Sequence, residues 1–416
     1  MSRAWSISLL AFTFACSDST EPRSAATFRV TPATQWSGGV VTVTSSSLRA
    51  GPAAPVFTAD GESLSVSRRN DSTVAITLPS GPSGVVALVR QGAAPDTVGV
   101  VQVVGLRAAR YVPGWLGYEP LSPSGIVPLV FVAQDLSNAN RGLTILDPVT
   151  DQVSTVSGVG PIESFYGILP SYLPNRFVLR DSLNQAGVWQ LFPTPAFIGF
   201  AADQSLTIRH ESQLADSVWL STSHNSWKIT RAGDTATSTQ NFITDPLRLA
   251  FSPSGDRAAL VVNLAGTGRV PVFDGHTGDT VYSVPLPASQ GVAFGAGSDQ
   301  LFVASRSLGG PDSLLAVAAS NGLRLAETAL PAGYSGWALA TDPKNDLLYQ
   351  VADSSGILEL LVFDGATLQL VGRLRCGACG TTEFWSAGVA VDTVTNRIHV
   401  AYPGNPIPLI TFDRLP

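Results

Sequence analysis

The feature that most constrains this chain is a pattern of short apolar segments and polar turns that recurs seven times between residues 121 and 413. In the clearest copy, residues 249–256 form an apolar segment and a turn, and three further apolar segments follow, the last ending at Val284. One four-stranded sheet cannot bury both of its faces alone, so a repeat of about 40–50 residues with four short strands is typical of propeller blades. The pattern therefore predicts an all-β chain that consists mainly of a seven-bladed β-propeller.

Two sets of positions keep this repeat in register. Neighbours in the first set, at the end of each leading strand, are 41 to 51 residues apart, and neighbours in the second set, in the turn after each third strand, are 41 to 49 apart. Helix pairs would need an apolar period of about 3.6 residues, whereas these segments are runs of Val, Leu, Ile and Phe between turn residues. The copies before residue 249 are degenerate, so six or eight blades stay open as alternatives. The first set is Leu121, Leu169, His210, Phe251, Phe294, Ala340 and Val391, and the second is Asp147, Gln190, Arg231, Asp274, Ala318, Asp364 and Asp413.

Three copies carry the motif Asp-x-x-Thr after the third strand, beginning at Asp147, Asp274 and Asp364. We interpret it as a turn in which the carboxylate accepts backbone N–H groups and the Thr hydroxyl supports the same bend. A calcium site is disfavoured, because it would need several oxygen ligands close together. With the Phe-Ser-Pro-Ser-Gly turn at residues 251–255, these motifs resemble the YVTN and YncE-like family of seven-bladed propellers, over residues 121–413.

The repeat ends on a third strand at residues 410–413, with no fourth strand after it. Circular closure removes an exposed sheet edge. We therefore expect a segment near residues 108–112 to supply the missing outer strand of the last blade, and we place the propeller domain at residues 106–416.

The first 16 residues have the features of an export signal: Arg3, an apolar stretch from Ala4 to Ala15, and Cys16 before a polar linker at residues 17–26. The stretch is too short to span a bilayer. It resembles a bacterial lipoprotein signal, which implies cleavage before Cys16, lipid attachment at Cys16 and, with Ser17 next, an outer-membrane or cell-surface location. An ordinary signal peptide, with Cys16 incidental, is the alternative.

Residues 27–105 have a different rhythm, with short alternating strands that predict a small immunoglobulin-like β-sandwich. The order of its signals is Pro32, then Gly-Gly-x-x-Thr-x-Thr at residues 38–44, then Leu-Pro at residues 78–79. This order resembles IPT/TIG domains, which implies a module that spaces or presents a larger domain.

Composition narrows the function classes. The net charge is −6 and charged residues make up only 13% of the chain, about half the usual share of ~25%. Without a basic stripe, we expect no nucleic-acid partner. No later segment is apolar enough for a transmembrane helix, so we expect membrane contact through the lipid alone.

The clearest local motif is Cys376-Gly-Ala-Cys379, placed after an outer strand. In an exported protein we expect a disulfide between Cys376 and Cys379. A zinc site would need two more ligands, and a thioredoxin-like site would need a helix, so both are weaker alternatives, as are free thiols. The four histidines are interpreted as structural. We expect no metal and no cofactor. The four are His210, His224, His276 and His399.

Aromatic residues gather in the segments that lead into the first strands of the copies around the ring closure. These segments face one side of a propeller and border its channel, so the side chains could form an arc that binds a ligand or protein, with Glu119, Glu163 and Glu383 at its margin. Wedges between adjacent blades are the alternative interpretation. The binding candidates are Trp115, Tyr118, Tyr166, Tyr334, Trp337 and Trp385.

No nucleophile elbow, zinc-protease motif or phosphate loop is present in the sequence, so no catalytic residue is assigned. The leading hypothesis is an exported, lipid-anchored binding or scaffold protein, whose ligand or partner the sequence does not identify. A propeller hydrolase of the lactonase type is the alternative, and an envelope-assembly component is a third possibility.

Overall fold

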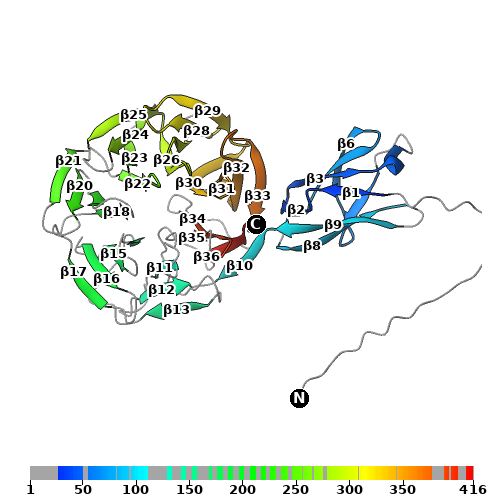
Figure 1. The fold of residues 1–416 in the computed structure, drawn as a ribbon, viewed down its shortest axis with the longest axis horizontal. Helices are drawn as coiled ribbons and strands as arrows, with labels where there is room; N and C mark the ends of the chain where they lie inside the picture. The colour runs from blue at the N-terminus through cyan, green and yellow to red at the C-terminus, as the bar shows by residue number, and fades with distance from the viewer. Residues whose placement is uncertain are drawn as a thin grey trace, which may run out of the picture.

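The computed structural model is built of strands, with one short 3-10 helix among the residues that it describes (Figure 1). These residues are 27–49, 55–80, 82–92, 95–110, 129–133, 142–146, 152–156, 168–170, 176–180, 186–190, 196–200, 207–211, 217–221, 225–230, 236–241, 246–254, 256–264, 267–274, 279–307, 309–342, 344–376, 388–392, 395–401 and 409–415.

The N-terminal part consists of two sheets packed face to face. Their shared core includes Val41 and Ile76 from the first sheet and Phe57, Leu88 and Val101 from the second. Successive side chains in a strand point to opposite faces of the sheet. Because apolar residues alternate with polar ones along these strands, each sheet has one apolar face, and the two apolar faces pack together. The first sheet has the order β1 (Arg29–Thr31), β3 (Val40–Thr44), β7 (Thr73–Thr77), β6 (Ser65–Asn70), and the second β2 (Thr34–Trp36), β9 (Asp96–Val104), β8 (Gly84–Arg90), β4 (Phe57–Ala59), β5 (Glu62–Ser63); the helix η1 is Ser46–Arg49.

After Gly105 the described strands form seven antiparallel sheets, which follow one another around a ring (Figure 1). Each sheet pairs strands that are consecutive in the chain, except the one that contains both β10 and β36. The sheets are β11 (Leu129–Ala133), β12 (Gly142–Leu146), β13 (Val153–Val156); β14 (Ile168–Pro170), β15 (Arg176–Arg180), β16 (Ala186–Gln190), β17 (Ala196–Phe200); β18 (Thr207–Glu211), β19 (Ser217–Ser221), β20 (Asn225–Thr230), β21 (Ala236–Asn241); β22 (Pro246–Phe251), β23 (Arg257–Leu264), β24 (Thr267–Asp274), β25 (Thr280–Leu286); β26 (Ser289–Phe294), β27 (Gln300–Ser305), β28 (Ser313–Ala318), β29 (Arg324–Ala329); β30 (Tyr334–Asp342), β31 (Leu347–Ser354), β32 (Ile357–Asp364), β33 (Leu370–Arg375); and β10 (Leu106–Arg110), β36 (Leu409–Asp413), β35 (Arg397–Ala401), β34 (Gly388–Asp392).

The repeat seen in the sequence matches these strands. The positions expected after third strands fall on the last residue of β16, β24, β28, β32 and β36, and directly after β12 and β20. The middle strands are mainly apolar because both of their faces are covered: six successive residues of β32 are buried, whereas β29, the outermost strand of its sheet, is exposed or half-buried along its length. Leu121 lies outside the described residues.

The ring is closed by a strand from the N-terminal side, as predicted. β10 pairs antiparallel with β36 and forms the outer strand of the last sheet. It occupies residues 106–110, two residues earlier than expected, since β9 continues into it with only Gly105 between. Asp413 N also donates a 3.0 Å hydrogen bond to the carbonyl of Gly105.

Outer strands share a β-bulge, in which two residues stand opposite one residue of the third strand. Val281, Leu325 and Val371 are the extra residues in β25, β29 and β33, and Arg107 is the extra residue at the equivalent place in β10. Because β10 reproduces this irregularity, it serves as a true fourth strand of its sheet. The three apolar bulge residues are 42%, 49% and 38% exposed.

In the copy at Asp364, the Asp-x-x-Thr turn makes the hydrogen bonds that the sequence predicts. Oδ1 of Asp364 accepts hydrogen bonds from the backbone N–H of Thr367 at 2.8 Å and from its hydroxyl at 2.6 Å. These bonds lower the pKa of the Asp364 carboxyl. The turn returns the chain from β32 to β33 and fixes the register of that pair.

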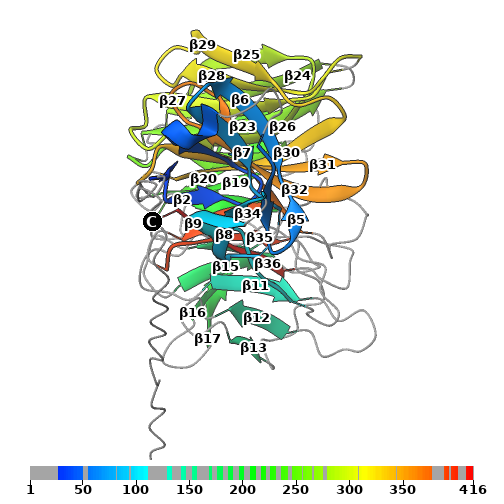
Figure 2. The same cartoon turned by 90° about the vertical axis from the view of Figure 1, so that its right-hand side faces the viewer.

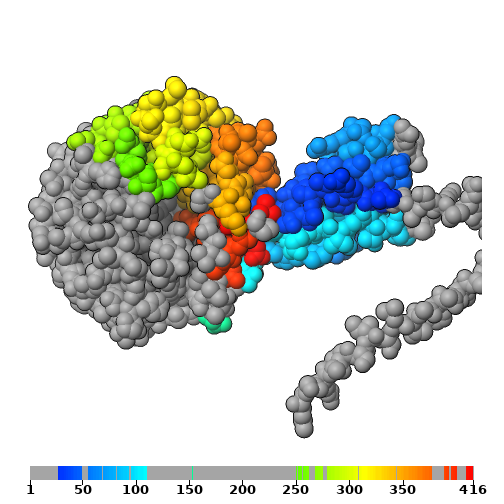
Figure 3. Space-filling model, viewed as in Figure 1, coloured from blue at the N-terminus to red at the C-terminus, as the bar shows by residue number. Residues whose placement is uncertain are grey.

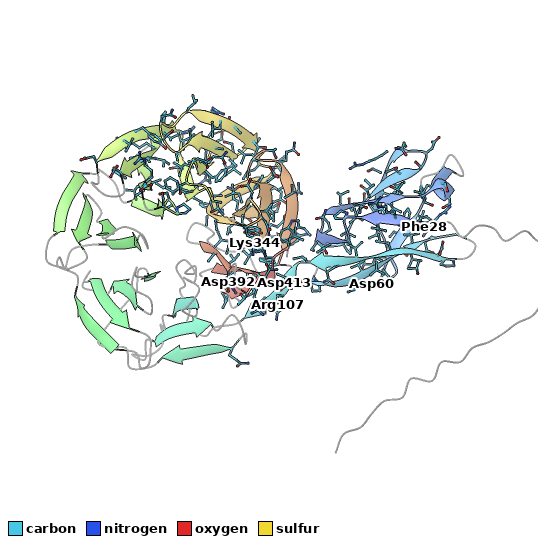
Figure 4. All side chains as sticks on the ribbon, in the orientation of Figure 1. Phe28, Asp60, Arg107, Lys344, Asp392 and Asp413 are labelled. Atoms are coloured by element: carbon cyan, nitrogen blue, oxygen red, sulfur yellow. The ribbon has the colours of Figure 1, made fainter. Side chains whose placement is uncertain are left out.

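The seam between the sheet β30–β33 and the closing sheet holds a buried ion pair. The guanidinium of Arg414 donates hydrogen bonds to both carboxylate oxygens of Asp342, and both side chains are fully buried. The third guanidinium nitrogen of Arg414, Nη1, donates to Oδ1 of Asn396 at 3.0 Å. On the surface of the closing sheet, Arg107 contacts Asp413 at 3.3 Å (Figure 4). The last sheet is thus joined to its neighbour by polar as well as apolar contacts.

Candidate binding surface

The first strands of four sheets contain a bulge in their leading halves. In β18, β22 and β26 the extra residue is Arg209, Leu247 or Gln290, and in β30 Trp337 and Ala338 together oppose Val351. A bulge increases the local twist and redirects the side chain that it carries. The bulge in β30 therefore determines where the Trp337 indole lies.

Trp337 is half-buried at the boundary between the sheets β26–β29 and β30–β33. The guanidinium carbon of Arg306, an exposed residue just after β27, lies 5.8 Å from the centre of the indole ring. Such a contact is attractive because the ring face is electron-rich. The indole Nε1–H is buried and has no acceptor among the residues that the structure describes.

The backbone at Trp337 is held tightly by the neighbouring sheet. A Cβ atom added to Gly291 of β26 would lie 2.3 Å from the carbonyl oxygen of Trp337, so only glycine fits there. Asp312 reinforces this boundary: its Oδ2 accepts a 3.2 Å hydrogen bond from the N–H of Gly336, and its Oδ1 accepts one from the N–H of Ser307. The position of Trp337 is therefore set by main-chain packing.

Tyr334 lies on the same strand but has different neighbours. Its hydroxyl donates a 2.6 Å hydrogen bond to Oε2 of Glu359, and Oε1 of Glu359 is 3.6 Å from Nε of Arg375. The guanidinium carbon of Arg373 lies 5.5 Å from the centre of the Tyr334 ring. Burial raises the pKa of Tyr334, and the hydrogen bond to Glu359 adds to the effect. Tyr334 is thus engaged across its own sheet by Glu359 and Arg373, and it shares no described contact with Trp337.

The other predicted binding residues, Trp115, Tyr118, Tyr166 and Trp385, lie outside the described residues, as do Glu119, Glu163, Glu383 and Cys16. The continuous aromatic arc therefore stays a prediction. Cys376 is fully buried directly after β33, and Cys379 lies outside the described residues, so their pairing also stays a prediction.

Two of the histidines fall in strands. His210 lies in β18, and His399 lies in β35, fully buried, with Nδ1 3.1 Å from the hydroxyl of Thr411. This setting of His399 within a sheet fits the structural interpretation. His224 and His276 lie outside the described residues.

Sequence reasoning missed Arg306, Asp312 and Gln350. Gln350 in β31 is fully buried, and neither polar atom of its side chain has a partner among the described residues. Its amide lies against Gly336, since a Cβ atom added there would be 2.1 Å from Nε2. None of the three stands out in the sequence, because their importance comes from contacts between different strands.

In the part of the chain that the structure describes, no three His, Cys, Asp or Glu side chains are grouped as a metal ion would require. The same part contains no helix that is long and apolar enough to cross a membrane.

Comparison with known proteins identifies the fold. No family model matches the chain, and no curated protein matches its sequence. A chain of the solved structure "Crystal Structure of Mitotic Checkpoint Complex" is similar, with a TM-score of 0.59 and 12% identity, over 75% of this chain and 92% of that one. That neighbour is a β-propeller, and the ring of antiparallel sheets here has the same fold. The class defined by the fold is therefore a β-propeller protein.

Proposed function

We propose that this protein is an exported, lipid-anchored scaffold that binds a protein partner through the propeller face carrying Trp337 and Arg306. The observation that carries the proposal is the contact between an exposed guanidinium and a half-buried indole at the boundary of two sheets. Trp and Arg are the residue types that most often dominate protein interfaces, particularly where they are held in place before binding. The close approach of Gly291 provides that restraint.

The surrounding architecture is part of the same proposal. We infer that each of the seven sheets is one blade, that the chain is similar to YVTN and YncE-like propellers, and that the two N-terminal sheets form an IPT/TIG-like immunoglobulin fold. The matching strand ends and the shared outer bulge support the blade count. The packing of two antiparallel sheets around one core supports the immunoglobulin-like assignment, although β2 and β9 pair in parallel.

The location of the protein rests on the sequence of residues 1–17. We infer that Cys16 carries a lipid and that the protein is held at the outer membrane or cell surface. Palmitate labelling in cells should disappear in Cys16→Ala. Unchanged labelling in that variant would refute the anchor without affecting the binding proposal.

The binding proposal is tested by cross-linking the tagged full chain in its own cell envelope and purifying the captured protein. The dissociation constant for the captured partner should rise by about thirtyfold or more in Trp337→Ala and in Arg306→Ala, as for interface residues that dominate binding. Arg324→Ala is the matched control, since Arg324 is an exposed arginine on the outer strand β29 that pairs with Glu327. Binding that is equal in all three variants, with thermal stability unchanged, would refute the proposal.

A further inference from the structure

Trp36 belongs to the N-terminal sandwich by sequence but to the propeller by packing. It ends β2, and only 1% of its surface is exposed. It is not part of the core that the two sandwich sheets share; it lies in the apolar cluster formed by the sheet β30–β33 and the closing sheet. Val104, the last residue of β9, lies in the same cluster. The sandwich therefore contributes two side chains to the interior of the ring's closing seam.

The site that receives Trp36 fits its shape. The indole ring is 6.1 Å from the ring of Tyr349, centre to centre, and nearly perpendicular to it at 82°. A Cβ atom added to Gly372 in β33 would lie 2.8 Å from two atoms of the indole, so glycine leaves the space that the ring occupies. Edge-to-face aromatic pairs of this kind are favourable beyond the area they bury.

The junction between the two parts is also held by hydrogen bonds. The N–H of Gly105 donates to the hydroxyl of Ser83 at 2.9 Å, and the N–H of Ser83 donates to the carbonyl of Leu106 at 3.1 Å. The N–H of Ser37, next to Trp36, donates to the carbonyl of Val104 at 2.7 Å. These bonds tie the start of β10 and the end of β2 to one another through the sandwich.

The placement of these contacts gives them a consequence for the whole ring. Among the described strands of the closing sheet, only β10 comes from the N-terminal side, so the ring opens if β10 leaves β36 or if the seam next to it separates. Trp36 fills that seam, and Gly105 joins β10 to the sandwich. Figure 3 shows the sandwich atoms lying directly against those of the last two sheets.

We propose that the N-terminal sandwich acts as a clamp that holds the propeller closed, because the side chain of Trp36 fills the closing seam. The sandwich and the ring then move as one body, and the seam opens only when the sandwich undocks. This role differs from that of a flexible spacer, and it does not depend on the proposed binding function.

Amide hydrogen exchange of the full-length protein tests the clamp, since it reports local opening strand by strand. In Trp36→Ala, exchange in β10 and β36 should become about a hundredfold faster, as expected when a buried aromatic side chain is removed, while β26–β29 stays unchanged. Trp36→Phe should produce a smaller increase in the same strands and serves if the alanine variant does not fold. Gly372→Ala, which leaves Trp36 in the chain but obstructs its site, should reproduce the effect.

Leu314→Ala is the matched control. Leu314 is fully buried in the cluster between the sheets β26–β29 and β30–β33, so its removal should speed exchange there and leave β10 and β36 unchanged. The clamp proposal is wrong if the Trp36 variants increase the amide exchange rate only in the sandwich strands, or if β10 and β36 stay as protected as in the wild type.

Discussion

The buried pair of Asp342 and Arg414 gives the sharpest stability prediction. Removing one partner of a buried ion pair typically costs about 3–5 kcal/mol, because the remaining charge stays desolvated without compensation. In Arg414→Met, Asp342 would keep three donors: the N–H of Lys344 at 3.0 Å, and the N–H and side-chain amide of Asn345, both at 3.3 Å. We therefore expect a loss near the lower limit, about 3 kcal/mol, or roughly a hundredfold in the population of the open seam.

The measurement is the free energy of unfolding from urea titration, together with amide exchange in β34–β36. Arg107→Ala is the control, since its pair with Asp413 is partly exposed and should contribute less than about 1 kcal/mol. High salt should reduce the effect of Arg107→Ala but not that of Arg414→Met, because buried pairs are screened less. In Asp342→Asn/Arg414→Met, much of the loss should be recovered, because no buried charge remains and the amide oxygen can still accept from the N–H groups of Lys344 and Asn345. The reasoning fails if Arg414→Met costs no more than Arg107→Ala.

Three further predictions concern single side chains. In Thr367→Val the pKa of Asp364, measured by NMR titration, should rise toward its ordinary value, because both Thr367 hydrogen bonds lower it and only the hydroxyl bond is removed. A lowered carboxyl pKa adds stability that is lost as the pH falls through it, so on acidification the variant should lose that stability at a higher pH than the wild type. Burial raises the pKa of Tyr282 to about 12, and its hydroxyl donates to the carbonyls of Ala318 and Ala319, so its contribution to the free energy of unfolding should be complete below pH ~10 and lost as the pH rises toward 12. Tyr282→Phe should cost about 1 kcal/mol at neutral pH and remove this alkaline loss of stability, and an unchanged dependence of stability on alkaline pH would contradict the prediction. The peptide containing Cys376 and Cys379 should resist alkylation until it is reduced, and alkylation at both positions in the unreduced protein would exclude the disulfide.

The sequence was sufficient for features that repeat. Strand ends at residues such as Asp274 and Asp364 recur at similar intervals, and turn chemistry marks them, so the ends of the third strands and the closing strand could both be predicted. Repetition averages out the ambiguity of any single short apolar segment.

Features that depend on contacts between strands could not be predicted. Period and turn signals place Tyr334 and Trp337 in the segment that leads into the first strand, but both residues lie within β30 itself. The bulge opposite Val351 separates their surroundings, and a bulge depends on cross-strand pairing. Arg414 near the chain end would ordinarily be a solvated charge, yet it is fully buried against Asp342. No sequence feature near Trp36 indicates that its side chain packs against residues more than three hundred positions later in the chain.

The bulges of the outer strands have a consequence for how this protein behaves among its own copies. Among the described strands, the outermost strand of a sheet such as β25 or β29 has no further strand beside it at the rim of the ring (Figure 2). A straight edge of this kind can add a strand from another molecule and start aggregation, and bulges are one way in which proteins prevent such pairing. Deleting Leu325 would straighten the edge of β29 and turn it into a surface on which chains could stack. We therefore expect the irregular rim to disfavour polymerisation at high concentration, although it leaves one apolar side chain exposed in each of β25, β29 and β33.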